Sequence, residues 1–396
     1  MKKFSLLPRI ILAIGAGIVI GSVSPDWIIK LFATFNGLFG NFLGFAIPLI
    51  IIGFIAPGIG TMGRGAGKLL GITTSIAYVS TVIAGLVAFF SASFLYPTLL
   101  KNQSFKEFEN PEESLLAPFF KVDMPPVMGV MTALLLAFTI GLGLAALKSD
   151  ALQNVMNDFR SIIEKLINAI IIPLLPIHIF GIFANMTHAG QVGDIMAVFA
   201  KVFVMIVALH LIYLLFQYSA AGAVSKRNPL KLIKEMLPAY FTALGTQSSA
   251  STIPVTLKHA KKLGAREKVA DFSIPLLATI HLSGSTITLV SCAIAVMVLQ
   301  GQTVGFMTIL PFILMLGITM IAAPGVPGGA VMAALGLLET MLGFDSMMLS
   351  LMIALYLAQD SFGTACNVTG DGAITVLADK MSGNDTISNK SAVKAS

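Results

Sequence analysis

Long apolar runs with very few charges are the feature that most constrains the fold of this chain. Of its 396 residues, 56% are hydrophobic and only 11% are charged, and the mean hydropathy is +0.89. Soluble domains carry roughly 25% charged residues, so this few charges could not cover a folded surface of this size. The composition excludes a cytosolic enzyme, a nucleic-acid-binding protein and a disordered chain, and it indicates an integral membrane protein.

Six apolar runs in the first part of the chain are long enough to cross a bilayer core, which needs about 20 helical residues. We place these spans near residues 5–23, 27–58, 69–98, 126–148, 160–187 and 194–224, with one polar loop at 99–125. Lysine and arginine gather before the first span and in the even-numbered loops, as Arg64 and Lys68 do. The positive-inside rule therefore predicts a cytoplasmic N-terminus.

The second part of the chain holds two apolar runs that are interrupted by small residues. Residues 229–267 begin and end with lysines around the tip Thr246–Pro254, which predicts a re-entrant hairpin entering from the cytoplasm. Residues 301–345 break at Ala322–Gly329, which predicts a second hairpin entering from outside. Paired breaks are typical of an inverted-repeat transporter with a mid-membrane site. The alternative is that both breaks are ordinary kinks.

Charge is unevenly distributed in this second part. From Val269 to Asp379, a stretch of 111 residues, there is no lysine or arginine, although the stretch holds six acidic residues. Ionisable groups inside a membrane are costly and mark binding sites by default. We therefore expect the functional site in this segment.

Four motifs, in order along the chain, resemble the dicarboxylate/amino acid:cation symporter family, which includes glutamate transporters and neutral amino acid exchangers. Asn367–Asp371 reproduces the NVTGD of the family's last helix. Pro275–His281 is similar to the PLGATIN that precedes the family's unwound NMDGT segment. The serine-rich tip Ser248–Pro254 and the turn Gly325–Gly328 match the tips of the family's two hairpins. The resemblance covers nearly the whole chain.

The resemblance implies an all-α membrane protein with eight transmembrane helices, two re-entrant helical hairpins and inverted repeats. It also implies a homotrimer in which a transport unit moves across the membrane like an elevator, past fixed scaffold helices. The scaffold would comprise residues 1–68 and 126–187, and the transport unit 69–98, 188–228, 229–267, 268–300, 301–345 and 346–380, with 99–125 an extracellular loop and 381–396 a disordered cytoplasmic tail.

The expected substrate site reflects the chemistry of an amino acid, whose ammonium and carboxylate each need a partner in a low-dielectric site. Asn367 and Asp371 follow Asp360 by seven and eleven residues, so on a helix the three share one face. Asp360 matches the family's amine-binding aspartate; the alternative is a structural acid. The resemblance implies that substrate contacts come from Ser248, Ser249, Gly325, Val326, Asp360, Gly363, Thr364 and Asn367.

Two departures from the family pattern bear on specificity. Members with acidic substrates carry an arginine three residues after the amine-binding aspartate, where this chain has Gly363. Gln247 stands where some members have another arginine. A second carboxylate buried in this base-free segment would lack a partner, which is strongly unfavourable. We predict a small neutral amino acid such as serine, threonine or alanine, with an acidic amino acid or dicarboxylate as the alternative.

The cation site departs from the pattern as well. The resemblance implies sodium coupling with ligands from Asp371, Asn367, Leu277, His281, Thr279 and Ala323, and weaker support from Tyr78 and Thr81. However, the family's NMD reads His281-Leu282-Ser283, so one cation-binding carboxylate is lost. Histidine has an unperturbed pKa of about 6.5, so His281 is either a proton carrier or a hydrogen-bonded core residue. We expect fewer sodium ions than glutamate carriers use, with proton coupling as an alternative.

Two other classes of function are less well supported. A cation channel would conduct without substrate, whereas hairpins with these tips favour a carrier. An intramembrane enzyme needs a nucleophile and a base such as Ser with Lys or His, but the site region lacks lysine and His281 has no evident nucleophile partner. We therefore expect no enzymatic activity. We predict a multi-pass plasma (inner) membrane carrier with both termini cytoplasmic, whose partners are its substrate, sodium, the bilayer and its own copies, with no nucleic acid and no organic cofactor.

Overall fold

The computed structural model describes residues 6–64, 68–99, 115–147, 149–190, 192–323 and 327–382, which form helices and connecting segments without strands. The helices are Leu6–Val23 (α1), Asp26–Arg64 (α2), Lys68–Leu99 (α3), Val130–Leu147 (α4), Asp150–Leu166 (α5), Ile172–His188 (α6), Val192–Ser225 (α7), Pro229–Thr246 (α8), Ser249–Ala260 (α9), Glu267–Ile280 (α10), Ser283–Leu299 (α11), Phe306–Ala322 (α12), Gly329–Leu342 (α13) and Ser346–Ser382 (α14). A π-helical turn, Ile167–Ile171, joins α5 to α6, and a 3-10 turn, Lys261–Leu263, follows α9.

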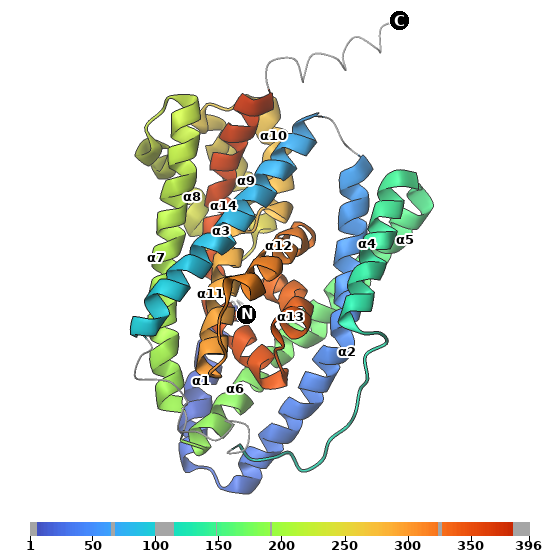
Figure 1. The fold of residues 1–396 in the computed structure, drawn as a ribbon, viewed down its shortest axis with the longest axis vertical. Coiled ribbons are helices and arrows are strands. Elements are labelled where there is room, and N and C mark those ends of the chain that lie inside the picture. Colours follow the sequence, from blue (N-terminus) through green and yellow to red (C-terminus); the bar gives the residue numbers. More distant parts are fainter. Residues whose placement is uncertain are drawn as a thin grey trace, which may run out of the picture.

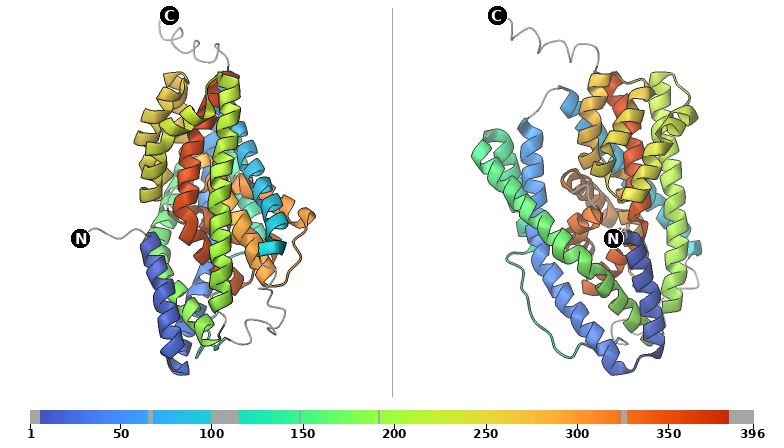
Figure 2. Two further views of the ribbon diagram at one scale, coloured as in Figure 1. Left: turned by 90° about the vertical axis from the view of Figure 1, so that its left-hand side faces the viewer. Right: turned by 180° about the vertical axis from the view of Figure 1, so that it is seen from behind.

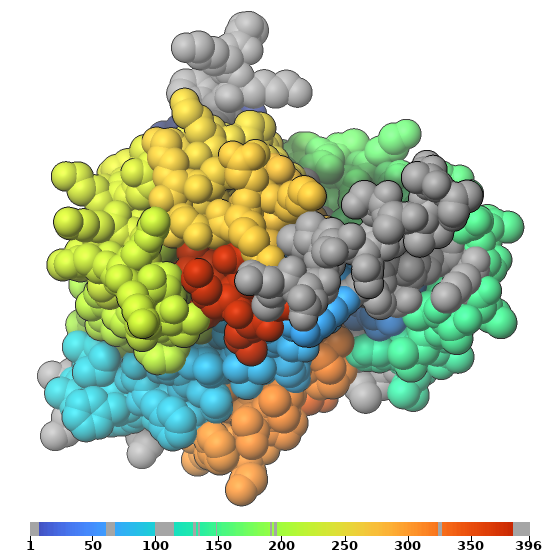
Figure 3. Space-filling model, turned by 90° about the horizontal axis from the view of Figure 1, so that it is seen from above, coloured from blue at the N-terminus to red at the C-terminus, as the bar shows by residue number. Residues whose placement is uncertain are grey.

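The helices pack as two groups, with α2, α4 and α5 to one side of α7 and α14, and α6 running diagonally from α5 toward α1 (Figures 1 and 2). In the first group α2 packs against α4, α5 and α6, and α1 packs against α6. In the second group α14 lies at the centre and contacts α3, α7, α8, α10 and α11. Figure 3 shows the end of α14, in red, between the yellow α8–α10 segment, the lime α7 and the blue α3. Fewer contacts join the groups, mainly between α2 and the α12–α13 pair and between α1 and α14.

Among the described residues, five helical segments are long and apolar enough to cross a membrane, fewer than the eight spans expected. They are Asp26–Gly60, Lys68–Leu99, Asp150–His188, Met196–Ser225 and Glu267–Leu299, and shorter apolar helices cover Pro8–Val23, Leu135–Leu147, Phe306–Ala322 and Gly329–Leu342. The helix α14 is 37 residues long but does not qualify. Its middle carries buried polar residues, including Asp360, Asn367 and Asp371, which lower its hydropathy.

The fifth span begins ten residues before the expected residue 160. Ser149 caps α5 by accepting a hydrogen bond from the Leu152 N–H at 3.4 Å. The α5 segment is amphipathic, so hydropathy alone did not mark it as helical. The π-helical turn that follows precedes Pro173, which has no N–H to donate to the previous turn.

The extended segment 115–129 is hydrogen-bonded to the first group of helices. The Leu116 N–H donates to Asn185 Oδ1 at 3.0 Å, and Asn185 Nδ2 donates back to the Leu116 carbonyl at 3.1 Å. Asn41 Nδ2 on α2 donates to the Val122 carbonyl at 2.6 Å. The rest of the expected loop, residues 100–114, and most of the expected tail, residues 383–396, lie outside the described residues.

An ion pair joins the start of α10 to the end of α14 and allows a test of the packing there. Arg266 Nε donates to Asp379 Oδ1 at 2.6 Å, and Arg266 Nη2 donates to Ser382 Oγ at 2.8 Å. The Asp379 side chain is only 5% exposed. Arg266→Ala should therefore lower the free energy of unfolding by about 1–3 kcal/mol, because it strands a buried acceptor. The decrease would be measured as a fall in melting temperature in detergent.

Lys261→Ala is the matched control. Lys261 pairs with Asp271 at 2.8 Å, but the two side chains are 32% and 50% exposed. Exposed ion pairs contribute less than about 1 kcal/mol. Equal destabilisation by both variants would contradict the assignment of Asp379 as a buried structural acid.

Candidate substrate and cation site

The expected helix at 268–300 is broken at the residues that resemble the unwound segment. His281 and Leu282 lie between α10 and α11, and the backbone at His281 is extended (φ −112°, ψ 94°). Asn367 caps the free end of α11, because its Oδ1 accepts from the N–H groups of Gly284 (2.7 Å) and Ser285 (3.3 Å). Asn367 Nδ2 donates to Ser285 Oγ at 3.0 Å. Both polar atoms of Asn367 thus hold the break together in this conformation.

Glycine permits a close approach of α11 to α14 at this break. A Cβ on Gly284 would lie 2.5 Å from the Gly363 carbonyl oxygen and 2.6 Å from Cys366 Cβ, so only glycine fits there. A Cβ on Gly363 would lie 3.4 Å from Ser285 N, which is ordinary contact. Gly363 therefore faces the first turn of α11 and tolerates a side-chain atom.

Asp360 on α14 contacts the start of α13, the second helix of the α12–α13 pair. Its Oδ2 accepts a hydrogen bond from the Gly328 N–H at 2.7 Å, and Asp360 is 5% exposed. Gly328 has a left-handed backbone (φ 74°) that caps α13, so the carboxylate lies at the positive end of that helix. Within the described part of the chain, no basic side chain forms an ion pair with Asp360. The expected contacts Gly325 and Val326 lie outside the described residues.

The serine-rich tip joins α8 to α9 in the first helix pair, α8–α9. Gln247 adopts a left-handed backbone (φ 54°), and Ser248 caps α9 by accepting from the Ser251 N–H at 3.3 Å. Ser248 and Ser249 are 7% and 3% exposed. The helix α9 packs against α14, which carries Asp360, Gly363, Thr364 and Asn367 at spacings that share one face.

His281 and Asp371 form a buried pair beside the break. His281 Nδ1 lies 2.9 Å from Asp371 Oδ1, and the two side chains are 0% and 1% exposed. His281 Nε2 lies 3.0 Å from Ser80 Oγ and 3.3 Å from Gln217 Nε2. An Nδ1–H that donates to Asp371 leaves Nε2 to accept from Ser80 or Gln217, so a neutral ring satisfies every contact.

The residues of α3 and α7 that contact His281 are Ser80 and Gln217, and not the Tyr78 and Thr81 expected to support the cation site. Ser80 on α3 reaches the ring, whereas Thr81 donates to the Ala77 carbonyl of its own helix at 2.9 Å. Tyr78 donates to the Leu314 carbonyl at 3.4 Å and lies outside this network. Sequence reasoning missed Ser80 and Gln217, although polar residues within apolar runs are the signal that could have found them.

Two buried oxygen atoms near the break are available to a cation. Asp371 Oδ2 and Gln217 Oε1 are buried without hydrogen-bond partners in the described part of the chain. A Cβ on Gly370 would lie 2.6 Å from Gln217 Oε1 and 3.1 Å from His281 Cε1, so the amide lies against α14 beside the histidine. Oxygen atoms of this type are the ligands that a hard cation takes.

The remaining expected cation ligands are engaged elsewhere or contribute only backbone. The Leu277 carbonyl accepts from the His281 N–H at 2.9 Å, and the Thr279 hydroxyl donates to the Leu276 carbonyl at 2.8 Å. Ala323 ends α12. The described residues hold no cluster of three or more His, Cys, Asp or Glu side chains suited to a metal. Asp371 is thus the carboxylate around which a cation site would form.

Comparison with protein families gives a match over residues 6–381 to the sodium:dicarboxylate symporter family. The match spans nearly the whole chain, including both helix pairs and the broken helix. It agrees with the family that the motifs resemble.

Proposed function

Because the chain belongs to the sodium:dicarboxylate symporter family, we propose that it is a secondary active symporter for a small neutral amino acid such as serine, threonine or alanine. The observation that carries this proposal is Asp360, a buried carboxylate at a helix-pair tip with no basic side chain paired to it in the described residues. A substrate ammonium would supply the missing positive charge. The cargo would bind between α14 and the tips of the two helix pairs.

The absence of bases supports a neutral cargo. No lysine or arginine occurs between residues 269 and 379, and Gly363 offers no side chain to a second carboxylate. Burying an unpaired carboxylate is strongly unfavourable. The first turn of α11 lies against Gly363, which supports a small substrate. The runner-up within the family is an acidic amino acid or dicarboxylate.

We propose sodium as the coupling ion, bound at Asp371 with help from Gln217. The support is the family membership and the two unpaired buried oxygens, Asp371 Oδ2 and Gln217 Oε1. His281 already hydrogen-bonds Asp371 Oδ1, and Ser283 replaces a carboxylate, so fewer sodium ions would bind than in glutamate carriers. The direct contact of His281 with Asp371 favours proton coupling as the second candidate.

The two helix groups support an elevator, in which α3 and α7–α14 move past α1, α2 and α4–α6. In this proposal the α8–α9 and α12–α13 pairs are the two re-entrant hairpins. We further propose that the protein is a homotrimer in the plasma (inner) membrane with both termini in the cytoplasm.

A binding screen in detergent tests the substrate and the ion together. The purified protein is heated with each of the twenty amino acids, in sodium chloride or in choline chloride. A ligand that binds only the folded state raises the melting temperature. Serine, threonine or alanine should do so in sodium and not in choline. A largest shift with aspartate or glutamate would overturn the neutral assignment.

Gly363→Arg should move the preference towards acidic substrates. An arginine at 363 starts beside Ser285 and offers two parallel hydrogen bonds to a side-chain carboxylate. We expect the ratio of aspartate to serine affinity to rise by about tenfold or more, measured by competition binding. Gly363→Ala is the matched control, because it adds the same Cβ without the charge. An equal change in both variants would show that bulk, not charge, sets the preference.

A further inference from the structure

A buried polar contact joins the two helix groups away from the site described above. His178 on α6 and Ser350 on α14 are 2% and 7% exposed, and His178 Nε2 lies 3.1 Å from Ser350 Oγ. The neighbouring residues of α6 are almost all apolar. Nothing in the substrate or cation chemistry uses either side chain.

The hydrogen bonds around His178 run in one direction once the Asn36 amide is oriented to satisfy its neighbours. With its side-chain nitrogen facing the ring, Asn36 on α2 donates to His178 Nδ1 at 3.1 Å and accepts from the Ile182 N–H at 2.9 Å. Because Nδ1 accepts, the ring hydrogen is on Nε2 and is donated to Ser350 Oγ. Ser350 Oγ in turn donates to the Ser346 carbonyl at 2.7 Å. A continuous chain of donors therefore runs from α2 through α6 to α14.

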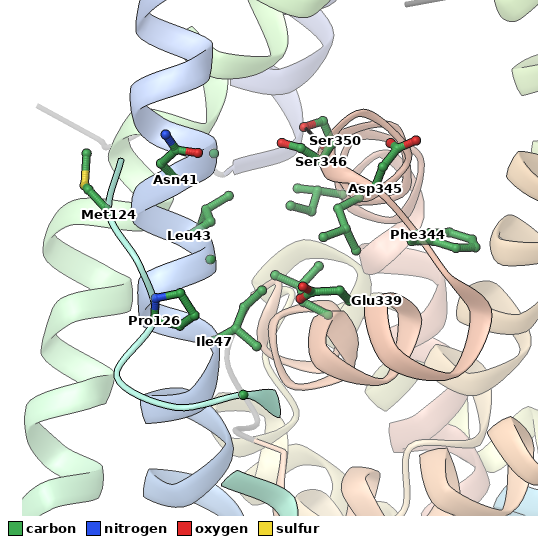
Figure 4. A pocket seen from close by; sticks show the side chains of 16 residues that line it. Asn41, Leu43, Ile47, Met124, Pro126, Glu339, Phe344, Asp345, Ser346 and Ser350 are labelled. Atoms are coloured by element: carbon green, nitrogen blue, oxygen red, sulfur yellow. Dashed lines mark hydrogen bonds between the residues drawn. The ribbon is translucent and has the colours of Figure 1, made fainter. Parts of the chain in front are cut away.

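The packing beside this contact is open. One cavity of about 320 Å³ lies between α2 and the α13–α14 turn, and Figure 4 shows Ser346 and Ser350 facing Asn41 and Leu43 across it. A second cavity of about 350 Å³ lies under the extended segment 115–118, and Ser346 and Ser350 line it as well. The His178–Ser350 hydrogen bond therefore lies beside two cavities, and not within a closely packed apolar interface.

Sliding of one group past the other must break this contact. One helical turn is about 5.4 Å, well beyond hydrogen-bond reach. His178 and Ser350 would then lose their partners in a buried setting unless water replaced them. We propose that His178 and Ser350 are positioning residues that hold the second helix group, α3 and α7–α14, in this conformation and set how often the group leaves it. The proposal rests on the elevator part of the proposed function.

The test compares His178→Leu and Ser350→Ala with the unaltered protein. Spin labels replace the exposed residues Asp158 on α5 and Lys258 on α9, and their distance distribution is measured without substrate. Each variant should lower the population of this conformation, relative to the one in which the second helix group has moved, by about tenfold. The double variant should shift this ratio little further than either single variant. Ser350→Thr, which keeps the hydroxyl, should restore the distribution.

A transport readout separates positioning from general stability. In proteoliposomes the turnover of serine should rise in both variants, whereas a variant that only destabilised the fold would lower it. Ser346→Ala is the matched control, because Ser346 lies on the same helix beside the same cavities and its side chain takes no part in the hydrogen bonds around His178. An unchanged distance distribution in His178→Leu and Ser350→Ala would overturn the proposal. Because that distribution needs no substrate, a wrong substrate assignment would leave the result interpretable.

Discussion

Asp360→Asn should lower the affinity for the amino acid by about 30-fold or more. Asparagine keeps the shape of the side chain and can still accept from the Gly328 N–H, but it carries no charge. Truncating one partner of a buried charged pair costs about 2–5 kcal/mol, roughly 30- to 5,000-fold in affinity. Isothermal titration with serine in sodium chloride measures the loss directly.

Asp345→Asn is the control for this prediction. Asp345 immediately precedes α14, is exposed, and accepts from the Met348 N–H at 2.8 Å, which asparagine can still do. The charge change is the same, so serine binding should be unaffected. If Asp360→Asn bound serine as tightly as Asp345→Asn does, Asp360 would not be the partner of the ammonium.

Asp371→Asn should remove the dependence of substrate binding on sodium. In the unaltered protein, raising sodium from about 1 mM to about 100 mM should strengthen serine binding about tenfold or more, which is a common size for coupling between sites. A neutral amide cannot compensate the charge of a cation in a buried site. The variant should therefore bind serine equally at both sodium concentrations. Titrations at matched ionic strength, with choline as the replacement, measure this.

The Asp345→Asn variant should keep the full sodium response, since its carboxylate lies outside the core. A full sodium response in Asp371→Asn would place the coupling ion elsewhere. If serine affinity were independent of sodium in every variant but rose on acidification, proton coupling through His281 would be favoured.

Hydropathy located most of the helices but could not define their ends or breaks. The amphipathic α5 was missed because its polar face hides it from a measure of average hydropathy. The break at His281–Leu282 was signalled only by the family resemblance, since the average hydropathy of Glu267–Leu299 is that of one continuous span. The physical cause of the break is tertiary, because Asn367 on α14 supplies the cap that the free end of α11 needs.

The acidic residues of the site could be predicted from the sequence, but the hydrogen-bond partners of the site residues could not. Helical spacing alone placed Asp360, Asn367 and Asp371 on one face of one helix. It could not show that Asn367 is engaged by backbone N–H groups, or that Ser80 and not Thr81 faces His281. These outcomes depend on how α3 is rotated against the broken helix, which is set by packing between distant segments.

Uptake into proteoliposomes tests the central claim most directly. The purified protein is reconstituted, a sodium gradient is imposed, and radiolabelled serine and aspartate are supplied separately, with choline replacing sodium in the parallel experiment. Saturable serine uptake that needs the sodium gradient, with no saturable aspartate uptake, is the predicted result. Saturable aspartate uptake at micromolar concentration, or serine uptake that is unchanged in choline, would contradict a sodium-coupled carrier of neutral amino acids.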